Sequence, residues 1–223
     1  MTYKCDIKFM AVQSRMCNVT KLCTQLGLSV SDVAIDKEMS GLPLRTSQTA
    51  FSLPYEDGVT HRLVLQDDLV INPYLKESIQ TLVNRFPDNP ICLYTYKKKD
   101  NIEKGVYKLH FMTAPALIMP RRIMNEINNE YRQYPMFIHD DWFYSWYCRR
   151  NGIIAYGVIP NLVTIDLSVE SVLAHKTLSF YTDLCFTDER VDIDALEDRT
   201  KSFCDGYINL SDKEFEEKLR ECN

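Results

Sequence analysis

The sequence predicts an α/β fold in which helices flank a mostly parallel sheet. Short apolar runs alternate with longer segments of helical periodicity over most of the 223 residues, which is the order expected of parallel strands joined by crossover helices. Two of these runs end in acidic residues, at Asp36 and at Asp67-Asp68. Ligands of such folds bind in the crevice outside the carboxyl ends of the strands, so we expect the functional site at this edge of the sheet.

The first half of the chain contains three predicted strands and two predicted helices. Each strand is a short apolar run, and polar residues or turn signals separate the runs from the segments around them. Gly27 is the expected stop of the first helix, and Gly41 and Pro43 lead into the second. The strands are expected at residues 7–12, 33–35 and 61–65, and the helices at about 16–26 and in the segment that carries Arg45 and Gln48.

The second half alternates in the same way as far as residue 163. Regularly spaced apolar side chains give one apolar face to the helix expected at 73–86. Pro120 is expected to open a later helix, because proline is tolerated in a first helical turn. The further elements are a strand at 91–96, an interior apolar run at 107–119, helices at 121–134 and 142–151, and a last core strand and turn at 157–163.

Beyond about residue 180 the chain becomes acidic and its pattern is helical. Helices are expected at 192–203 and 211–222, the second with a capping box made by Ser211 and Glu214. We therefore expect a main domain over residues 1–180 and a helical C-terminal appendage over residues 181–223. The appendage either packs on the core or serves oligomerisation, and the sequence leaves both open.

Composition excludes several classes of protein. Hydrophobic residues make up 45% and charged residues 26%, which excludes a disordered or fibrous chain. The net charge of −5 argues weakly against general nucleic-acid binding, although the clusters 97–99, 121–122 and 149–150 are basic. The eight cysteines form no Cys-x-x-Cys pair, so structural zinc is not expected. With no signal-peptide pattern and no apolar run of transmembrane length, we expect a cytoplasmic protein.

The chemistry of the predicted site depends on the adjacent acids Asp67 and Asp68. Two carboxylates side by side repel each other, and a bound cation is a common remedy; the alternative is a solvated turn. If the three strand ends converge, Ser14, Arg15 and Asp36 join the acids at one edge. Asp36 would then bind a ribose or base, and Asp68 would hold Mg²⁺ or Mn²⁺ beside a diphosphate. The chain has no Gly-x-Gly-x-x-Gly and no Walker lysine loop, which disfavours dinucleotide-binding Rossmann and P-loop proteins.

These motifs resemble those of a known family. Val64–Asp68 (VLQDD) resembles the short acidic motif of metal-dependent nucleotide-sugar glycosyltransferases of the GT-A fold, in a variant where Gln66 replaces the first acid. The resemblance spans about residues 7–178 and implies a Rossmann-like sheet; small enzymes of this kind are frequent in bacteria and their phages. Its other parts are Ala11–Arg15 (AVQSR), Ile35-Asp36, Gly41 with the Arg45/Gln48 helix, His139–Trp142 (HDDW), Ile159–Val163 (IPNLV) and Ser171–His175 (SVLAH).

The resemblance implies a role for each matching residue. Asp68 would bind the metal, with His175 as a second ligand or a diphosphate contact. Asp140 or Asp141 would be the acceptor-side acid, which acts as general base in inverting members. The donor would be bound by Val12, Ser14, Arg15, Asp36, Arg45, Gln66 and Asp67. The sequence departs from the family at Gln66 and after Leu162-Val163, where relatives often place a histidine and this chain has Thr164-Ile165-Asp166.

The expected function is transfer of a sugar from a nucleotide sugar, with a UDP-sugar favoured, to a hydroxyl acceptor with the help of Mn²⁺ or Mg²⁺. The acceptor is open: a glycan, a lipid-linked sugar, a protein, or a hydroxymethylated base in phage DNA, for which the aromatic segment 142–147 would wall the extruded base. Nucleotidyl transfer is disfavoured because no early glycine-rich loop is present. The other alternative is an inactive nucleotide-sugar-binding module in which Gln66 marks a lost site.

Overall fold

The computed structural model describes residues 3–37, 42–95, 103–131, 139–169 and 186–203, together with Lys213, Glu214 and Glu217. Within these residues one large mixed sheet is flanked by helices. Its strands are β1 (Cys5–Val12), β2 (Val33–Asp36), β3 (His61–Gln66), β5 (Ile91–Cys92), β6 (Gly105–Leu109), β7 (Ala116–Pro120), β8 (Ala155–Ile159) and β10 (Asp198–Phe203). The helices are α1 (Met16–Leu26), α2 (Pro43–Ser52), α3 (Leu75–Arg85), α4 (Arg121–Tyr131) and α5 (Asp140–Arg150).

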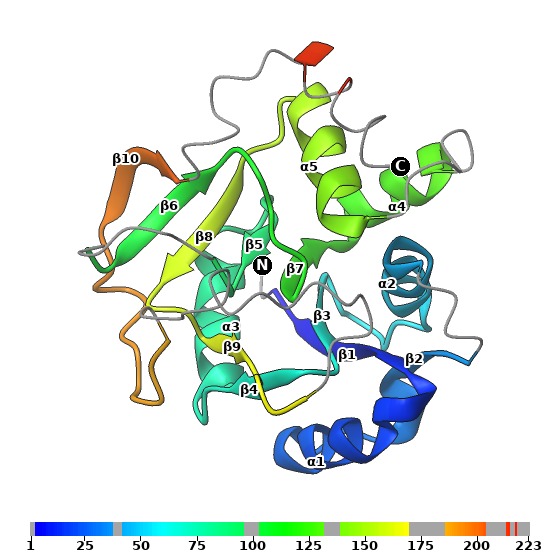
Figure 1. Ribbon diagram of the computed structural model, residues 1–223. Coiled ribbons are helices and arrows are strands. Elements are labelled where there is room, and N and C mark those ends of the chain that lie inside the picture. The colour runs from blue at the N-terminus through cyan, green and yellow to red at the C-terminus, as the bar shows by residue number, and fades with distance from the viewer. Residues whose placement is uncertain are drawn as a thin grey trace.

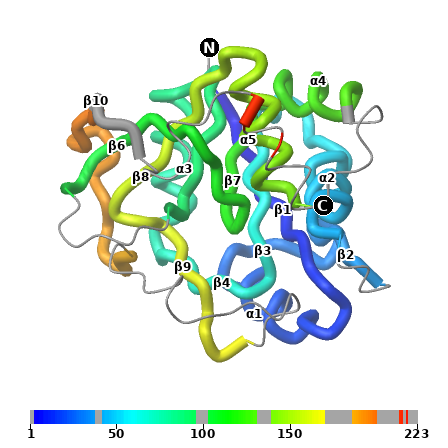
Figure 2. The backbone as a smooth tube through the Cα atoms, turned by 45° about the horizontal axis from the view of Figure 1, so that its top comes forward, coloured from blue at the N-terminus to red at the C-terminus, as the bar shows by residue number. Residues whose placement is uncertain are grey.

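The strand order across the large sheet is β10-β6-β8-β5-β7-β3-β1-β2. Figures 1 and 2 show β10 and β2 at opposite ends of the molecule. The pairs β1–β2, β1–β3, β5–β8 and β6–β10 are parallel, and β3–β7, β5–β7 and β6–β8 are antiparallel. The predicted α/β class, with a mostly parallel sheet and flanking helices, is confirmed. A second, two-stranded antiparallel sheet pairs β4 (Leu69–Ile71) with β9 (Val163–Ile165).

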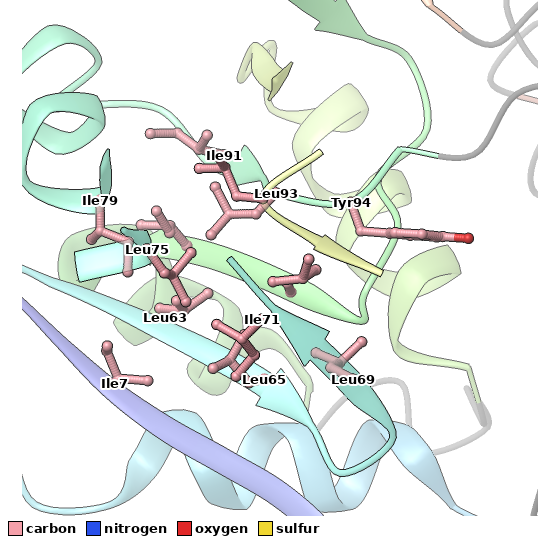
Figure 3. Packing of buried hydrophobic residues seen from close by; sticks show 14 of the residues in the cluster. Ile7, Leu63, Leu65, Leu69, Ile71, Leu75, Ile79, Ile91, Leu93 and Tyr94 are labelled. Atoms are coloured by element: carbon pink, nitrogen blue, oxygen red, sulfur yellow. The ribbon is translucent and has the colours of Figure 1, made fainter. Parts of the chain in front are cut away.

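Alternating side chains of the central strands divide the core into two layers. On β3, Leu63 and Leu65 pack with α1, α3 and the β4–β9 sheet, and Figure 3 shows this layer from close by. Val64, between them, packs on the other face with α2, α4 and α5. Leu63, Val64 and Leu65 are all at most 1% exposed, and full burial of one such side chain contributes about 1.5–3 kcal/mol. Both faces of β3 are therefore covered, which leaves its carboxyl end as the place where it meets solvent.

Arg62 anchors the opposite, amino-terminal end of β3. Its side chain is fully buried, and its Nε and Nη2 donate to the two carboxylate oxygens of Asp6 on β1 at 2.9 and 2.6 Å. Nη1 donates to backbone carbonyls at the end of α2, those of Phe51 (2.9 Å) and Leu53 (2.6 Å) among them. These are the orphan carbonyls that a helix leaves at its C-terminus. Arg62 thus joins two strands to the end of a helix.

The helix predicted at residues 192–203 is wrong, since an irregular segment there leads into β10, which pairs with β6. Ile193 and Leu196 are buried in the core, and their spacing matches the periodicity of a helix, which explains the wrong prediction. Arg85 of α3 instead donates to the carbonyls of both residues and to Asp198, which fixes an extended path. Of the helix predicted at 211–222, only Lys213, Glu214 and Glu217 are described, and these are helical. The division of the chain at residue 180 stays a prediction.

Three smaller differences concern the middle of the chain. The strand predicted at 91–96 ends at Cys92, because the side chain of Asn161 binds the backbone of Thr95 through both its oxygen and its nitrogen. The run 107–119 divides into β6 and β7 rather than forming one interior segment. Pro120 is the last residue of β7 instead of the first of α4. Within the described part of the chain, no helix has the length and apolar character needed to cross a membrane.

Candidate active site

The carboxyl ends of β2, β1 and β3 lie side by side. All three strands are parallel, and their register places Val12 beside Asp36 and Met10 beside Gln66. The residues that follow β1 and β3 therefore meet at one edge of the sheet, as the sequence predicts. The edge carries Asp36 from β2, the loop Gln13–Arg15 after β1, and Asp67-Asp68 after β3.

The acid pair is buried and bound to Arg15. Asp67 and Asp68 are 5% and 8% exposed, which excludes the alternative of a solvated turn. Nη1 of Arg15 lies 2.6 Å from Oδ1 of Asp67 and 3.2 Å from Oδ2 of Asp68. The other oxygen of Asp67, Oδ2, accepts the backbone N–H of Val12 at 2.8 Å, and the side chain of Asn18 donates to the Asp67 carbonyl at 2.5 Å. Asp67 is thus held from β1 and from α1 at once.

The charges of this cluster do not balance among its three side chains. One guanidinium faces two carboxylates, so the Arg15–Asp67–Asp68 cluster carries a net charge of −1 when all three groups are ionised. A buried ion pair is costly to desolvate, and breaking one by removing a partner typically costs about 3–5 kcal/mol. Two adjacent carboxylates in such a place attract cations.

The donor set suits a hard divalent cation. Mg²⁺ is commonly held by one or two carboxylates together with phosphate oxygens of a ligand, and Asp67 and Asp68 supply carboxylates of this kind. Across the described residues, no three His, Cys, Asp or Glu side chains come together in a way that would hold a metal ion without a ligand. His175, the predicted second ligand, lies outside the described residues, as do Gly41 and the segment 171–175.

Asp166 and Asn18 are two residues at this site that were not among the predicted site residues. The backbone N–H of Asp166, directly after β9, donates to the carbonyl of Asp68 at 2.7 Å. Its carboxylate accepts hydrogen bonds from the backbone and hydroxyl of Ser168, which closes a turn beside the acid pair. The signal for Asp166 in the sequence was its place directly after an apolar run. Asn18 gave no signal, because its contact with Asp67 spans 49 residues.

The second acid pair, Asp140 and Asp141, begins α5. Asp140 is 4% exposed, and its Oδ1 accepts the N–H of Asp141 at 3.0 Å; its Oδ2 has no hydrogen-bond partner among the described residues. Asp141 is more exposed, and its Oδ1 accepts the N–H of Trp142 at 2.8 Å. Burial raises the pKa of both carboxyls, and for Asp140 the charge of Asp141 raises it further. Both groups therefore hold a proton at a higher pH than an ordinary aspartate.

The segment 112–115 connects the second acid pair to the edge that carries the first, through hydrogen bonds at both of its ends. The N–H of Gln66 donates to the carbonyl of Pro115 at 2.9 Å. Three residues earlier, the N–H of Met112 donates to Ser145 Oγ at 2.8 Å, and this hydroxyl donates to the Asp141 carbonyl at 2.6 Å. The start of α5 is thus held near the edge of the sheet where β3 ends.

The remaining residues that were predicted to bind the sugar donor differ in how far they are exposed. Asp36, Gln66 and Val12 are partly buried, whereas Ser14 is exposed. Arg45 is exposed on α2, directly after the segment 38–41, which is outside the described residues. The described geometry brings Val12 and Arg15 into contact with the acids, and it shows no contact between Arg45 and the acids.

The two described arginine clusters lie at the other edge of the sheet. Arg121 and Arg122 follow the end of β7, which is paired with the start of β3. Arg149 and Arg150 end α5, shortly before β8 begins, and β8 runs in the same direction as β3. Neither cluster is at the acid edge. The cluster 97–99 lies outside the described residues.

Comparisons with known proteins identify no family for this chain. No protein-family model matches the sequence, and no curated protein matches it either. One solved structure with a similar backbone is a glycosyltransferase involved in the glycosylation of the major capsid of PBCV-1. It is 14% identical, the match covers 58% of this chain and 68% of that chain, and the TM-score is 0.27. A likeness of this extent establishes neither a family nor an activity.

Proposed function

We propose that this chain is a metal-dependent glycosyltransferase that moves a sugar from a nucleotide sugar, with a UDP-sugar favoured, to a hydroxyl acceptor. The observation that carries the proposal is the buried cluster of Arg15, Asp67 and Asp68 at the carboxyl ends of adjacent parallel strands. Ligands of α/β folds bind at this place, and the mixed charges suit a diphosphate with its counter-ion. The motifs that resemble the GT-A family fall on these same residues.

The donor would lie along the ends of β2, β1 and β3. Asp36, partly buried at the end of β2, would accept a hydrogen bond from the ribose or base. Ser14 and Arg15 would line the nucleotide pocket, and Asp68, with Asp67 beside it, would hold Mn²⁺ or Mg²⁺. Once bound, the cation would offset the negative charge that develops on the departing nucleoside diphosphate. His175 stays a predicted further ligand.

Asp141 is the better candidate of the second pair for the general base. Both carboxyls have a raised pKa, and a base works best when its pKa lies near the working pH. Asp141 is partly exposed, whereas Asp140 is almost fully buried, so only Asp141 can readily meet an acceptor hydroxyl. In this assignment Asp141 takes the proton of the acceptor hydroxyl. Asp140 keeps its own proton and accepts the backbone N–H of Asp141 at the start of α5.

The identity of the acceptor is left to experiment. A modified base in DNA would require phosphate contacts near the reacting groups. The two described arginine clusters are at the opposite edge of the sheet, so they do not favour DNA over a glycan, a lipid-linked sugar or a protein. An inactive binding module would keep the donor site and lack turnover.

Thermal unfolding with nucleotide ligands tests the proposal. The wild-type protein is compared with Asp68→Asn and with the control Asp88→Asn, which removes an exposed carboxylate that pairs with Arg122. Each is heated with UDP and other nucleoside diphosphates and nucleotide sugars, with and without Mn²⁺. A ligand at about 100 times its dissociation constant adds roughly 2.7 kcal/mol, so we expect metal-dependent stabilisation of wild type and Asp88→Asn only.

The same panel distinguishes the alternatives. If no nucleotide raises the midpoint of wild type under any metal condition, the proposed donor site is wrong. If UDP-sugars stabilise the protein, release of sugar from the donor is measured for wild type and Asp141→Asn with sugar, lipid and hydroxymethylated DNA acceptors. Turnover that Asp141→Asn loses supports the enzyme, and binding without turnover on any acceptor supports the module.

A further inference from the structure

We infer that Arg15 and a divalent cation compete for the same two carboxylates, so that the ion binds well only when a diphosphate draws Arg15 away. The inference rests on the proposed function for the diphosphate, but the competition itself concerns only this chain and the ion. It makes Arg15 the residue that couples binding of the metal to binding of the donor.

The geometry of the cluster supports the competition. One nitrogen, Nη1 of Arg15, contacts both acids, at 2.6 Å from Asp67 Oδ1 and 3.2 Å from Asp68 Oδ2. This nitrogen therefore lies between the two carboxylates, where positive charge is best placed to offset both. Asp67 Oδ2 accepts the Val12 N–H and Oδ1 is the oxygen that Arg15 contacts, so an ion bound to Oδ1 would share or take the position of the guanidinium.

Burial makes the competition stronger than it would be at a surface. The side chains of Arg15, Asp67 and Asp68 are 12%, 7% and 11% exposed in these ion pairs, so little water separates or screens the charges. A divalent ion and a guanidinium at the same two carboxylates repel each other. A lone ion would thus lose binding energy to Arg15, whereas a diphosphate offers the guanidinium new acceptors, which Arg side chains bind well.

The acids remain in place when Arg15 moves. The carboxylate of Asp67 keeps its bond from Val12, its carbonyl keeps the bond from Asn18, and the carbonyl of Asp68 keeps the bond from Asp166. These three contacts come from β1, α1 and the segment after β9, and none involves Arg15. These contacts would therefore keep Asp67 and Asp68 in place whether their carboxylates face an arginine or an ion.

The competition is tested with Mn²⁺ alone. The Mn²⁺ affinity of wild type, Arg15→Gln and the control Arg122→Gln is measured by calorimetry, without nucleotide. Couplings between sites are typically 5–150-fold, and we expect Arg15→Gln to bind Mn²⁺ at least about 5-fold more tightly than wild type. Arg122→Gln removes an exposed arginine paired with Asp88 and Glu126, and its affinity is expected to equal that of wild type. Adding Asp68→Asn to Arg15→Gln is expected to abolish the gain.

Equal or weaker Mn²⁺ binding by Arg15→Gln would overturn the inference. If Arg15→Gln fails to fold, Arg15→Lys replaces it; a lysine ammonium is a point charge without the guanidinium fork, and this variant is expected to bind Mn²⁺ more tightly than wild type. Lysine and wild-type affinities that agree would overturn the inference as well.

A second titration, with UDP present, reports on the coupling. We expect UDP to tighten Mn²⁺ binding to wild type by a larger factor than to Arg15→Gln, because only wild type gains from moving the arginine. An equal factor in both proteins would refute the role of the diphosphate. If UDP binds to neither protein, the proposed function fails while the result with Mn²⁺ alone still decides the competition.

Discussion

Replacing Asp140 by asparagine is expected to stabilise the protein at high pH and to leave it nearly unchanged at low pH. Asp140 is 4% exposed, and burial together with the charge of Asp141 raises its pKa in the folded protein. A raised pKa means that the folded state favours the protonated carboxyl. The stabilisation is complete below the ordinary pKa, near 4, and is lost as the pH rises through the folded pKa.

The magnitude follows from the size of the shift. Burial and the charge of Asp141 raise the pKa of Asp140 to about 7, and each unit of pKa corresponds to about 1.4 kcal/mol, so the ionised Asp140 costs on the order of 4 kcal/mol of folding free energy at pH 8. The opposing effect is the attraction of a negative charge to the start of α5, which contributes about 0.3–1 kcal/mol at most helices. Burial therefore outweighs the helix dipole here. Asparagine also keeps the oxygen that accepts the Asp141 N–H.

Urea unfolding at pH 3.5 and pH 8 measures the effect. We expect Asp140→Asn to exceed wild type by about 2–4 kcal/mol at pH 8 and to lie within about 0.5 kcal/mol of it at pH 3.5, below the ordinary pKa of an aspartate. The control Asp88→Asn, at an exposed position, is expected to change the free energy by less than about 0.5 kcal/mol at both pH values. Equal destabilisation by Asp140→Asn at both pH values would show that the ionised carboxylate is favourable and that the reasoning from burial is wrong.

Three further predictions concern other parts of the molecule. Arg62→Met should lower the free energy of unfolding by about 3–5 kcal/mol in urea titrations, because Asp6 is left buried without its partner; adding Asp6→Leu should recover much of the loss. Asp141→Asn should slow sugar transfer by about 10²–10⁴-fold while the midpoint shift produced by the donor is kept, and loss of both would place Asp141 in the donor site instead. Gly157→Ala should destabilise by about 1–3 kcal/mol, since the added methyl would lie 2.6 Å from Thr95 Cγ2; calorimetric melting without a lowered midpoint would contradict this.

The local signals in the sequence predicted the elements that local chemistry determines. The helix expected at 16–26 is α1, because its apolar spacing gives a buried face and Gly27 adopts the left-handed conformation that ends it, with φ of 59°. The acids at the ends of β2 and β3 could be predicted as neighbours, because parallel strands bring their carboxyl ends to one edge. In both cases the information lies within a few residues or in a general rule of topology.

Contacts between residues that are far apart along the chain could not be predicted from local sequence patterns. β10 pairs with β6 about a hundred residues earlier in the chain, and the segment before it, whose Ile193 and Leu196 have helix-like spacing, is extended because Arg85 binds the carbonyls of both residues. In the same way, the strand expected at 91–96 ends early because Asn161 binds Thr95 across 66 residues. The sequence predicts Arg15 at the same edge as Asp67, 52 residues along the chain, but the ion pair between them was not predicted.

Arg62 in β3 and Arg15 in the loop after β1 show how a structural ion pair differs from one at a candidate ligand site. Arg62 faces one carboxylate, and its other donors bind backbone carbonyls at the end of α2, so the charges of the pair cancel and the group serves to join elements. Arg15 faces two carboxylates and leaves a charge of −1 among the three side chains. Two acids this close together repel each other, so positive charge beside them is favourable. An acid pair at the edge where α/β folds bind ligands is suited to a cationic partner, and this is why the proposed function rests on the Arg15 cluster and not on Arg62.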